Sequence, residues 1–267
     1  MYSREVEHLL PDSAVLAEFL DRLGSAPASA LLLDYDGTLA PFRLERDRAY
    51  PYPEVVPLVE QIVDCSKTRV VIISGRPVAE LKDLLSSLRN LEMWGAHGLE
   101  RITPDGSYQQ ARIAWNTLEL LSKAREWVMK ANLIPIAEVK PGGIAIHFRG
   151  MSQAEAEDIE VRLMEGWGEI AGSPELKLLR FESGIELRVA RPDKGDAVAS
   201  IIDDFDPTAE IAYLGDDLTD EDSFRALNGR GLTVLVRPEY RATAAQVWLR
   251  PPEGLIDFLQ QWLIRLQ

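Results

Sequence analysis

The stretch LLLDYDGTLA at residues 31–40 runs an apolar segment directly into two acidic residues separated by one position. Side chains in an extended segment alternate between two faces, so Asp34 and Asp36 project to the same side. Two carboxylates this close repel each other unless a cation lies beside them or one is protonated. A divalent metal such as Mg²⁺ prefers carboxylate oxygen and would relieve the repulsion. The alternative is a strand-to-turn junction in which aspartate only favours the turn.

Similar apolar runs recur along the chain and alternate with segments of helical periodicity. Short strands that are apolar on both faces and alternate with helices indicate a parallel sheet covered on two sides. The sequence therefore predicts an α/β fold with a doubly wound, Rossmann-like parallel-sheet core, in which ligands bind beyond the carboxyl ends of the strands. We expect strands at 30–35, 69–74, 211–215 and 232–236, and helices at 13–23, 55–65, 78–88, 194–204 and 220–227.

Residues 113–190 have a different pattern, with two helical segments and several strand-like ones bounded by polar turns. We expect a small α+β cap domain inserted into a core made of residues 1–112 and 191–267, with hinges at 112–114 and 189–193. Its expected helices are 115–131 and 152–165, and its expected strands are 143–148, 176–181 and 184–189.

The composition suits a globular protein. The chain has 267 residues, 46% of them hydrophobic, which suits one large domain or a core with an inserted second domain. Its net charge of −14 argues against binding to nucleic acid or an anionic membrane surface. An anionic substrate would therefore need a local positive site or a metal ion.

Cysteine usage and apolar run length bear on location. The single cysteine, Cys65, excludes an intrachain disulfide and a cysteine-based zinc cluster, and we interpret it as a small core residue. No apolar run approaches the roughly 20 residues of a membrane span. The start MYSREVEHLL lacks the basic-then-apolar order of a secretory signal. We expect a cytoplasmic protein.

Two polar clusters stand at the end of a predicted strand or the start of a predicted helix. Ser74-Gly75-Arg76 follows RVVII at 69–73 and offers a hydroxyl and backbone amides to a phosphoryl oxygen, although a serine here is more often only an N-cap. Lys194 opens a helix, where a cation is disfavoured. The lysine fits this place if it faces an anion; otherwise it reaches out to solvent.

The densest acidic cluster is GDDLTDED at 215–222, beside the predicted strand at 211–215. So many acids at one strand end need a counter-charge, and a metal ion is the simplest. Glu221 and Asp222 are explained by the dipole of the next helix, which favours acids in its first turn. Asp216 is not, and we interpret it as a candidate metal ligand.

Taken in chain order, these motifs resemble the haloacid dehalogenase-like phosphatases. The order is DYDGTL, a strand ending in serine, Lys-Gly and GDDLTDED, with an insertion between the second and third. More narrowly, the chain is similar to trehalose-6-phosphate phosphatases, which carry an α+β cap at this place. The motifs that carry this likeness are DYDGTLAP (34–41), SGRP (74–77), GAHGLE (95–100) and YLGDDLTDEDSF (213–224), and it covers roughly residues 30–240.

The resemblance implies a mechanism and a ligand set. Asp34 would be the nucleophile that forms an aspartyl-phosphate, and Asp36 the general acid and base. Lys194 and Ser74 would hold the phosphoryl oxygens. Mg²⁺ would be held by Asp34, the backbone carbonyl of Asp36 and Asp216, with Asp217 near or behind it.

Polar residues would select the sugar by hydrogen bonds to its hydroxyls, and closure of the cap would exclude water. His147 is equally well explained as an ordinary strand histidine, and an internal salt bridge competes for Arg149 and Glu186. The candidate substrate-binding residues are Lys140, His147, Arg149 and Glu186 on the cap, with Arg76 and His97 on the core.

We expect Mg²⁺-dependent hydrolysis of a phosphorylated disaccharide, trehalose 6-phosphate. The segment GIELRVARPDKG (184–195) departs from the EIRP-like pattern of the family, so sucrose 6-phosphate and mannosyl-3-phosphoglycerate are alternatives. A mutase, or a regulatory module that binds without turnover, is less favoured; a decayed site would have lost acids or the lysine of these motifs.

No glycosyltransferase-sized region precedes residue 30, so we expect no fused synthase. The tail at 255–263 is an amphipathic helix that packs on its own core in a monomer or, alternatively, forms a dimer contact.

Overall fold

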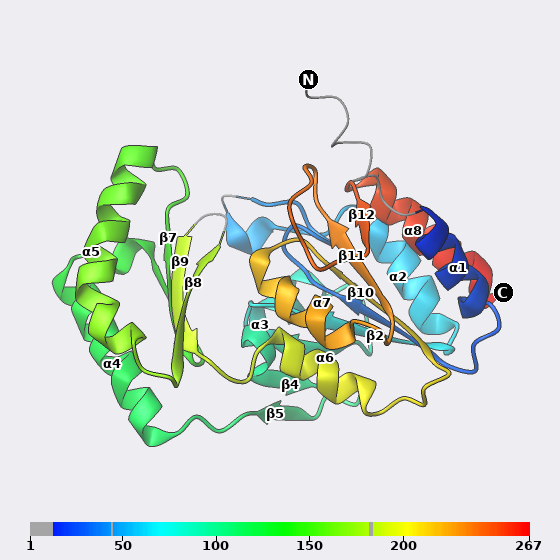
Figure 1. Cartoon of the computed structure of the whole chain (residues 1–267), viewed down its shortest axis with the longest axis horizontal. Helices are drawn as coiled ribbons and strands as arrows, with labels where there is room; N and C mark the ends of the chain where they lie inside the picture. Colours follow the sequence, from blue (N-terminus) through cyan, green and yellow to red (C-terminus); the bar gives the residue numbers. More distant parts are fainter. Residues whose placement is uncertain (1–12, 44, 182–183) are drawn as a thin grey trace.

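A computed structural model describes residues 13–43, 45–181 and 184–267. The chain forms a large α/β unit and a smaller α+β unit beside it (Figure 1). Residues 1–12, in which the sequence showed no secretory signal, lie outside the described residues. Among the residues that are described, no helix has the length and apolar character needed to cross a membrane.

The large unit is built on an eight-stranded sheet with the order β12-β11-β10-β1-β2-β3-β4-β5. Neighbouring strands from β12 to β3 are parallel, and the two pairings at the β5 edge are antiparallel. The strands are β1 (Ser29–Leu33), β2 (Thr68–Ile73), β3 (Glu92–Gly95), β4 (Glu100–Ile102), β5 (Tyr108–Gln110), β10 (Glu210–Gly215), β11 (Leu232–Val236) and β12 (Val247–Leu249).

Helices cover both faces of this sheet. Because side chains alternate along a strand, Leu31 and Leu33 of β1 pack with one layer of helices, while Ala30 and Leu32 pack with the other. The first layer contains α1 (Ser13–Leu23), α2 (Val55–Asp64), α3 (Val78–Leu84) and α8 (Glu253–Leu266); the second contains α6 (Lys194–Ile202) and α7 (Glu221–Leu227). The predicted doubly wound α/β core is confirmed.

The register of the central strands determines where the polar motifs meet. Leu33, the last residue of β1, pairs with Leu214 of β10 on one side and with Ile72 of β2 on the other. The carboxyl ends of these parallel strands therefore lie at one edge of the sheet. Residues that directly follow them, such as Asp34 and Asp216, emerge side by side.

The smaller unit has a four-stranded antiparallel sheet with the order β6-β7-β9-β8. Its helices cover the outer face of this sheet, whose other side turns toward the large unit (Figure 1). The elements are α4 (Trp115–Lys130), β6 (Ala137–Lys140), β7 (Gly143–His147), α5 (Gln153–Ala171), β8 (Leu176–Phe181) and β9 (Gly184–Val189). We propose residues 113–190 as the cap domain, which contains all of these elements.

Short elements were missing from the sequence prediction. Strands β3 to β6 and β12 have three or four residues each, and the 3₁₀ turns η1 (Arg46–Arg48), η2 (Ala96–Gly98), η3 (Ile134–Ile136) and η4 (Leu218–Asp220) have three. Such segments are too short to show a period of their own. Helix α5 also extends six residues beyond its predicted end at 165.

The C-terminal helix packs on its own core, as the first of its two interpretations predicted. Phe258 and Trp262 of α8 are buried, and the Trp262 ring lies 5.7 Å from that of Phe19 in α1. The indole N–H of Trp262 donates to Thr68 Oγ1 at 3.1 Å. Cys65, predicted to be a core residue, is only partly buried at the end of α2.

A pair of tryptophans tests the core of the cap. Trp167 of α5 is fully buried and donates to the backbone carbonyl of Ala124 in α4 at 3.2 Å, while Trp115 is 80% exposed. We expect Trp167→Ala to lower the free energy of unfolding by about 3–5 kcal/mol, because it leaves a large cavity. The matched change Trp115→Ala should cost less than about 0.5 kcal/mol. Guanidinium denaturation measures both, and equal losses would contradict the packing described.

Candidate active site

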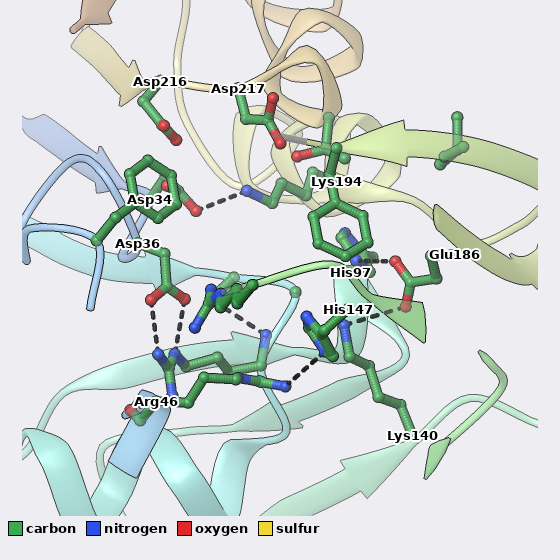
Figure 2. Close-up of a pocket in the computed structure, with 18 residues that line it drawn as sticks. Asp34, Asp36, Arg46, His97, Lys140, His147, Glu186, Lys194, Asp216 and Asp217 are labelled. Atoms are coloured by element: carbon green, nitrogen blue, oxygen red, sulfur yellow. Dashed lines mark hydrogen bonds and ion pairs between the residues drawn. The ribbon is translucent and has the colours of Figure 1, made fainter. Parts of the chain in front are cut away.

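One cleft brings together every site residue that the sequence analysis proposed. The core supplies its floor and the cap sheet a facing wall (Figure 2). The predicted residues that line it are Asp34, Asp36, Ser74, Arg76, His97, Lys140, His147, Arg149, Glu186, Lys194, Asp216 and Asp217.

A buried lysine lies between two carboxylates at the floor. Lys194 Nζ donates to Asp34 Oδ1 at 2.6 Å and to Asp220 Oδ1 at 2.7 Å. Only 3% of the lysine is exposed, so the interpretation that it reaches to solvent is wrong. Burial would lower the pKa of Lys194, but Asp220 and Asp34 outweigh burial and hold that pKa well above its usual value. The ammonium therefore stays charged beside the proposed nucleophile.

The acids at this edge of the sheet form the candidate metal site. Asp34, Asp216 and Asp220 are buried, and each offers a carboxylate oxygen within 4.8 Å of the others. Asp216 Oδ2 is buried and has no hydrogen-bond partner among the described residues. A buried carboxylate oxygen without a donor is costly, and a hard divalent cation would satisfy it. The residues present fit Mg²⁺.

Glycine is required beside this acid. Gly37 has a φ of +81° and lies so close to Asp216 that a Cβ at residue 37 would overlap its carboxylate. Positive φ favours glycine, and the turn is closed by a hydrogen bond from Gly37 N to Ala40 O at 2.8 Å. The glycine of DYDGTL thus lets the first acidic motif approach the second.

The titration of the acids reflects the same crowding. Burial raises the pKa of Asp34 to about 7, with Lys194 opposing and Asp220 reinforcing the rise. Burial, together with Asp34 and Asp220, also raises the pKa of Asp216 well above its usual value. The raised pKa values mean that too little positive charge lies near these carboxylates to stabilise their ionised forms. A bound divalent cation would supply it.

Asp36 stands apart from the other acids and is held by an arginine. Arg76 donates from Nε and Nη2 to the two carboxylate oxygens of Asp36, each at 2.6 Å. The Arg76 side chain is 2% exposed and lies over the Tyr35 ring at 5.6 Å. Arg76 was predicted to bind the substrate, whereas its side chain in the structure holds Asp36.

Ser74 stands at the end of β2 and does not cap the next helix. Helix α3 begins at Val78 with Pro77 as its N-cap residue, so the N-cap interpretation is wrong. Ser74 Oγ instead accepts a hydrogen bond from Arg76 N at 3.1 Å, and Ser74 O accepts from His97 N at 3.0 Å. The serine is buried and lines the cleft.

His97 lies on a strained turn of the core, and its side chain contacts the cap. Ala96 and His97 have positive φ values of 47° and 58°, and such strain in non-glycine residues is concentrated at functional sites. His97 Nε2 lies 3.0 Å from Glu186 Oε2 on β9, and Lys140 Nζ lies 3.1 Å from the other oxygen of Glu186. A cap carboxylate is thus paired from both sides. The internal salt bridge considered for Glu186 exists, and the residue still lines the cleft.

His147 and Arg149 also connect the cap with the core. His147 Nε2 lies 2.8 Å from Glu138 Oε2 in the cap and 3.4 Å from Arg46 Nη1 in the core. Arg149 Nη1 donates to the backbone carbonyl of Arg43 at 2.7 Å. Both side chains therefore bridge the two units at the wall of the cleft.

Asp217 and its neighbours organise the end of β10. Asp217 Oδ1 accepts from Leu218 N at 2.7 Å, so it caps η4 while lining the cleft. Asp222 accepts from Lys177 Nζ of β8 at 3.2 Å, which adds another contact between core and cap. Glu221 lies in the first turn of α7, as predicted, and also accepts from Thr243 Oγ1 and Ala244 N, each at 2.8 Å.

Asp220, Arg46 and Glu138 were not among the site residues predicted from the sequence. Asp220 is fully buried and accepts from Tyr213 OH at 2.6 Å as well as from Lys194. A signal existed for Asp220, because the tyrosine hydroxyl inside the apolar run IAYLG needs a buried partner. No comparable signal marked Arg46 or Glu138, whose contacts join distant parts of the chain.

The fold is that of the haloacid dehalogenase-like hydrolases. A solved hydrolase of this class from B. subtilis has a TM-score of 0.61 and 15% identity, and the match covers 87% of this chain and 99% of that one. The solved C-terminal domain of C. albicans trehalose-6-phosphate phosphatase has a TM-score of 0.78 and 20% identity, covering 93% and 96%.

The family described as Trehalose-phosphatase matches this chain over residues 32–247, which is most of its length. The chain is also 31% identical over 264 residues to a trehalose-phosphate phosphatase of Mycobacterium marinum; the match covers 93% of this chain but 65% of that relative, less than two thirds of its length. The chain therefore belongs to the trehalose-phosphatase family.

His97 makes a testable contribution to pH-dependent stability. Burial lowers the pKa of His97 to about 4, although Glu186 opposes that shift. As the pH falls below the unfolded value of about 6.5, the unfolded chain binds a proton that the folded chain does not. The free energy of unfolding should therefore fall with pH, by up to about 1.4 kcal/mol per unit from this group.

We expect His97→Gln to flatten this slope between about pH 6.5 and 5, above the range in which ordinary carboxylates titrate. Chemical denaturation at a series of pH values measures the slope. The curves of the two proteins should run parallel above about pH 7.5, where the histidine is neutral in both states. An unchanged slope below pH 6.5 would show that His97 titrates normally.

Proposed function

We propose that this protein is a Mg²⁺-dependent phosphatase that hydrolyses trehalose 6-phosphate to trehalose and phosphate. The observation that carries the proposal is the convergence of Asp34 and Asp216 on one point, where Asp216 Oδ2 lacks a partner among the described residues and Lys194 faces Asp34. Family membership supports the same reaction. The cytoplasmic location of the protein and its monomeric or dimeric state remain predictions.

In this mechanism Asp34 attacks phosphorus as the bond to the sugar oxygen breaks, forming an aspartyl-phosphate. Asp36 gives a proton to the leaving sugar oxygen and then takes one from the water that hydrolyses the intermediate. Asp34, Asp216 and the backbone carbonyl of Asp36 would hold Mg²⁺, with Asp217 and Asp220 beside it. The ion, when bound, would offset negative charge on the carboxylates and the phosphoryl oxygens.

Lys194 and Ser74 would bind the phosphoryl group. Both residues line the cleft, and Lys194 Nζ donates to Asp34 at 2.6 Å. Donors at this place would stabilise the charge that spreads over the phosphoryl oxygens during transfer. Although the whole chain is strongly anionic, the cleft lining carries cations as well as acids. The cations are Arg46, Arg76, Lys140, Arg149 and Lys194, and they offset the acids Asp34, Asp36, Glu186, Asp216 and Asp217. A bound divalent cation would add the positive charge that an anionic substrate needs.

The cap residues supply the proposed sugar recognition. Glu186 and Lys140 present buried charged groups to the cleft at its cap side, with His147 and Arg149 beside them. Charged and amide-like groups of this kind hydrogen-bond sugar hydroxyls and leave unpaired groups when a different sugar is bound. Preference among phosphorylated sugars should therefore arise here rather than at the phosphate.

A substrate panel tests the function directly. We expect the highest kcat/KM for trehalose 6-phosphate, lower values for sucrose 6-phosphate and mannosyl-3-phosphoglycerate, and loss of activity when a chelator removes Mg²⁺. Release of phosphate in step with free sugar would exclude a mutase. Preference for another sugar phosphate would reject the substrate, and full activity in chelator would reject the metal.

Replacement of the proposed nucleophile is a second test. We expect Asp34→Asn to lower kcat by at least about 10³-fold, because an amide cannot form the phosphorylated intermediate. Far-ultraviolet circular dichroism should remain that of the folded protein. The matched control Asp83→Asn changes an exposed aspartate of α3 and should retain full activity. Comparable activity in both variants would remove Asp34 from its role.

A further inference from the structure

Arg46 forms an unexpected connection across the cleft. It lies on the short turn η1 after the DYDGTL motif, and its side chain is only 22% exposed. Its guanidinium pairs with Glu80 of α3 at 3.2 Å on the core side and with Glu138 of β6 on the cap side. Nη1 also lies 3.4 Å from His147 Nε2. One core side chain thus reaches two strands of the cap, and Figure 2 shows its contact with His147.

The same residue is one step away from Asp36. Arg76, which holds both oxygens of Asp36, donates from Nη1 to the backbone carbonyl of Arg46 at 2.9 Å and to Glu80 Oε2 at 3.2 Å. Glu80 Oε2 is the oxygen that also accepts from Arg46 Nη2. Arg46 therefore fixes the Arg76 guanidinium twice, through its own carbonyl and through the shared carboxylate.

These contacts form a continuous chain from the cap to the proposed general acid. Guanidinium–carboxylate pairs are directional, since the planar fork fixes its partner in one orientation. The order along the chain is Glu138 and His147, then Arg46, Glu80, Arg76 and Asp36. A displacement of the cap would therefore reach Asp36, the proposed general acid, through this chain of contacts.

We propose that Arg46 is a positioning residue that couples docking of the cap to the orientation of Asp36. Through this coupling, proton delivery to the leaving oxygen is efficient only while the cap lies against the core. The inference rests on the proposed function, in which Asp36 is the general acid. It assigns Arg46 no contact with the reacting atoms.

The size of the effect follows from what is transmitted. General acid catalysis contributes about 10²–10⁴-fold, and a displacement of about 1 Å in a reacting group can cost about 10²-fold. Loss of Arg46 loosens Arg76 without removing it. We therefore expect a partial loss, of about 10-fold, in the step that needs the proton.

Two substrates with different leaving groups distinguish positioning of the general acid from binding of the sugar. Propyl phosphate expels an alkoxide that needs a proton, whereas 4-nitrophenyl phosphate expels a phenolate that leaves without one. Neither ester has sugar hydroxyls for the cap to bind. Because kcat/KM reports on steps up to the first irreversible transfer, the ratio of the two values measures the contribution of the acid and excludes hydrolysis of the intermediate.

We expect Arg46→Gln to lower kcat/KM for propyl phosphate about 10-fold more than for 4-nitrophenyl phosphate. Asp36→Asn should shift the ratio further in the same direction. Glu138→Gln, which breaks the chain at the cap, should shift it as Arg46→Gln does. The control Arg48→Gln removes an exposed arginine from the same turn and should leave the ratio at the wild-type value.

Equal losses on the two esters in Arg46→Gln would overturn the inference, since they would mean that Arg46 only shapes the cleft. Failure of the wild-type protein to hydrolyse any ester would instead reject the proposed function. If Arg46→Gln does not fold, the ratio is measured in Arg46→Lys, which keeps the charge without the fork, and in Glu80→Gln. A shifted ratio in both supports the coupling, and an unshifted ratio in both rejects it.

Discussion

The structure depends on a concentration of negative charge at one edge of a parallel sheet. Asp34, Asp216 and Asp220 are buried within a few ångströms of one another, with the Lys194 ammonium between two of them. Burying like charges is unfavourable unless they are paired or coordinate a cation. The turn at Gly37, the buried tyrosine hydroxyl at residue 213 and the lysine at the start of α6 can all be understood as responses to that requirement.

The cap wall applies the same rule at a second place. Glu186 is paired by Lys140 and His97, and Glu138 by Arg46 and His147. In each pair of contacts, one comes from the cap itself and one from the core. These ion pairs and histidine hydrogen bonds thus do more than offset the charge of the acids, because they also hold the two units in one relative position over the cleft. Recognition and chemistry share a single electrostatic network.

The parts of this arrangement that could be predicted are those encoded locally. Apolar runs predicted the central strands β1, β2, β10 and β11. Because the carboxyl ends of parallel strands lie at one edge of a sheet, Asp34, Asp216 and Ser74 could be placed together at that edge. The order of motifs indicated the inserted cap. Residues defined by a distant partner could not be found this way, since nothing near Arg46 points to Glu138, 92 positions later. Likewise, the bidentate pairing of Arg76 with Asp36 arises from tertiary structure alone.

The position of the cap within the chain has a consequence for folding. β1 must pair with β10 across about 180 intervening residues, as Ser29 meets Glu210. The closure entropy of such a loop grows only logarithmically, about 0.6 kcal/mol for each doubling of length. The cap is contiguous and packs around its own cluster, so it shortens the effective loop once formed. An insertion of this size therefore adds little to the free energy needed to assemble the sheet, and caps of other lengths would be accommodated at similar cost.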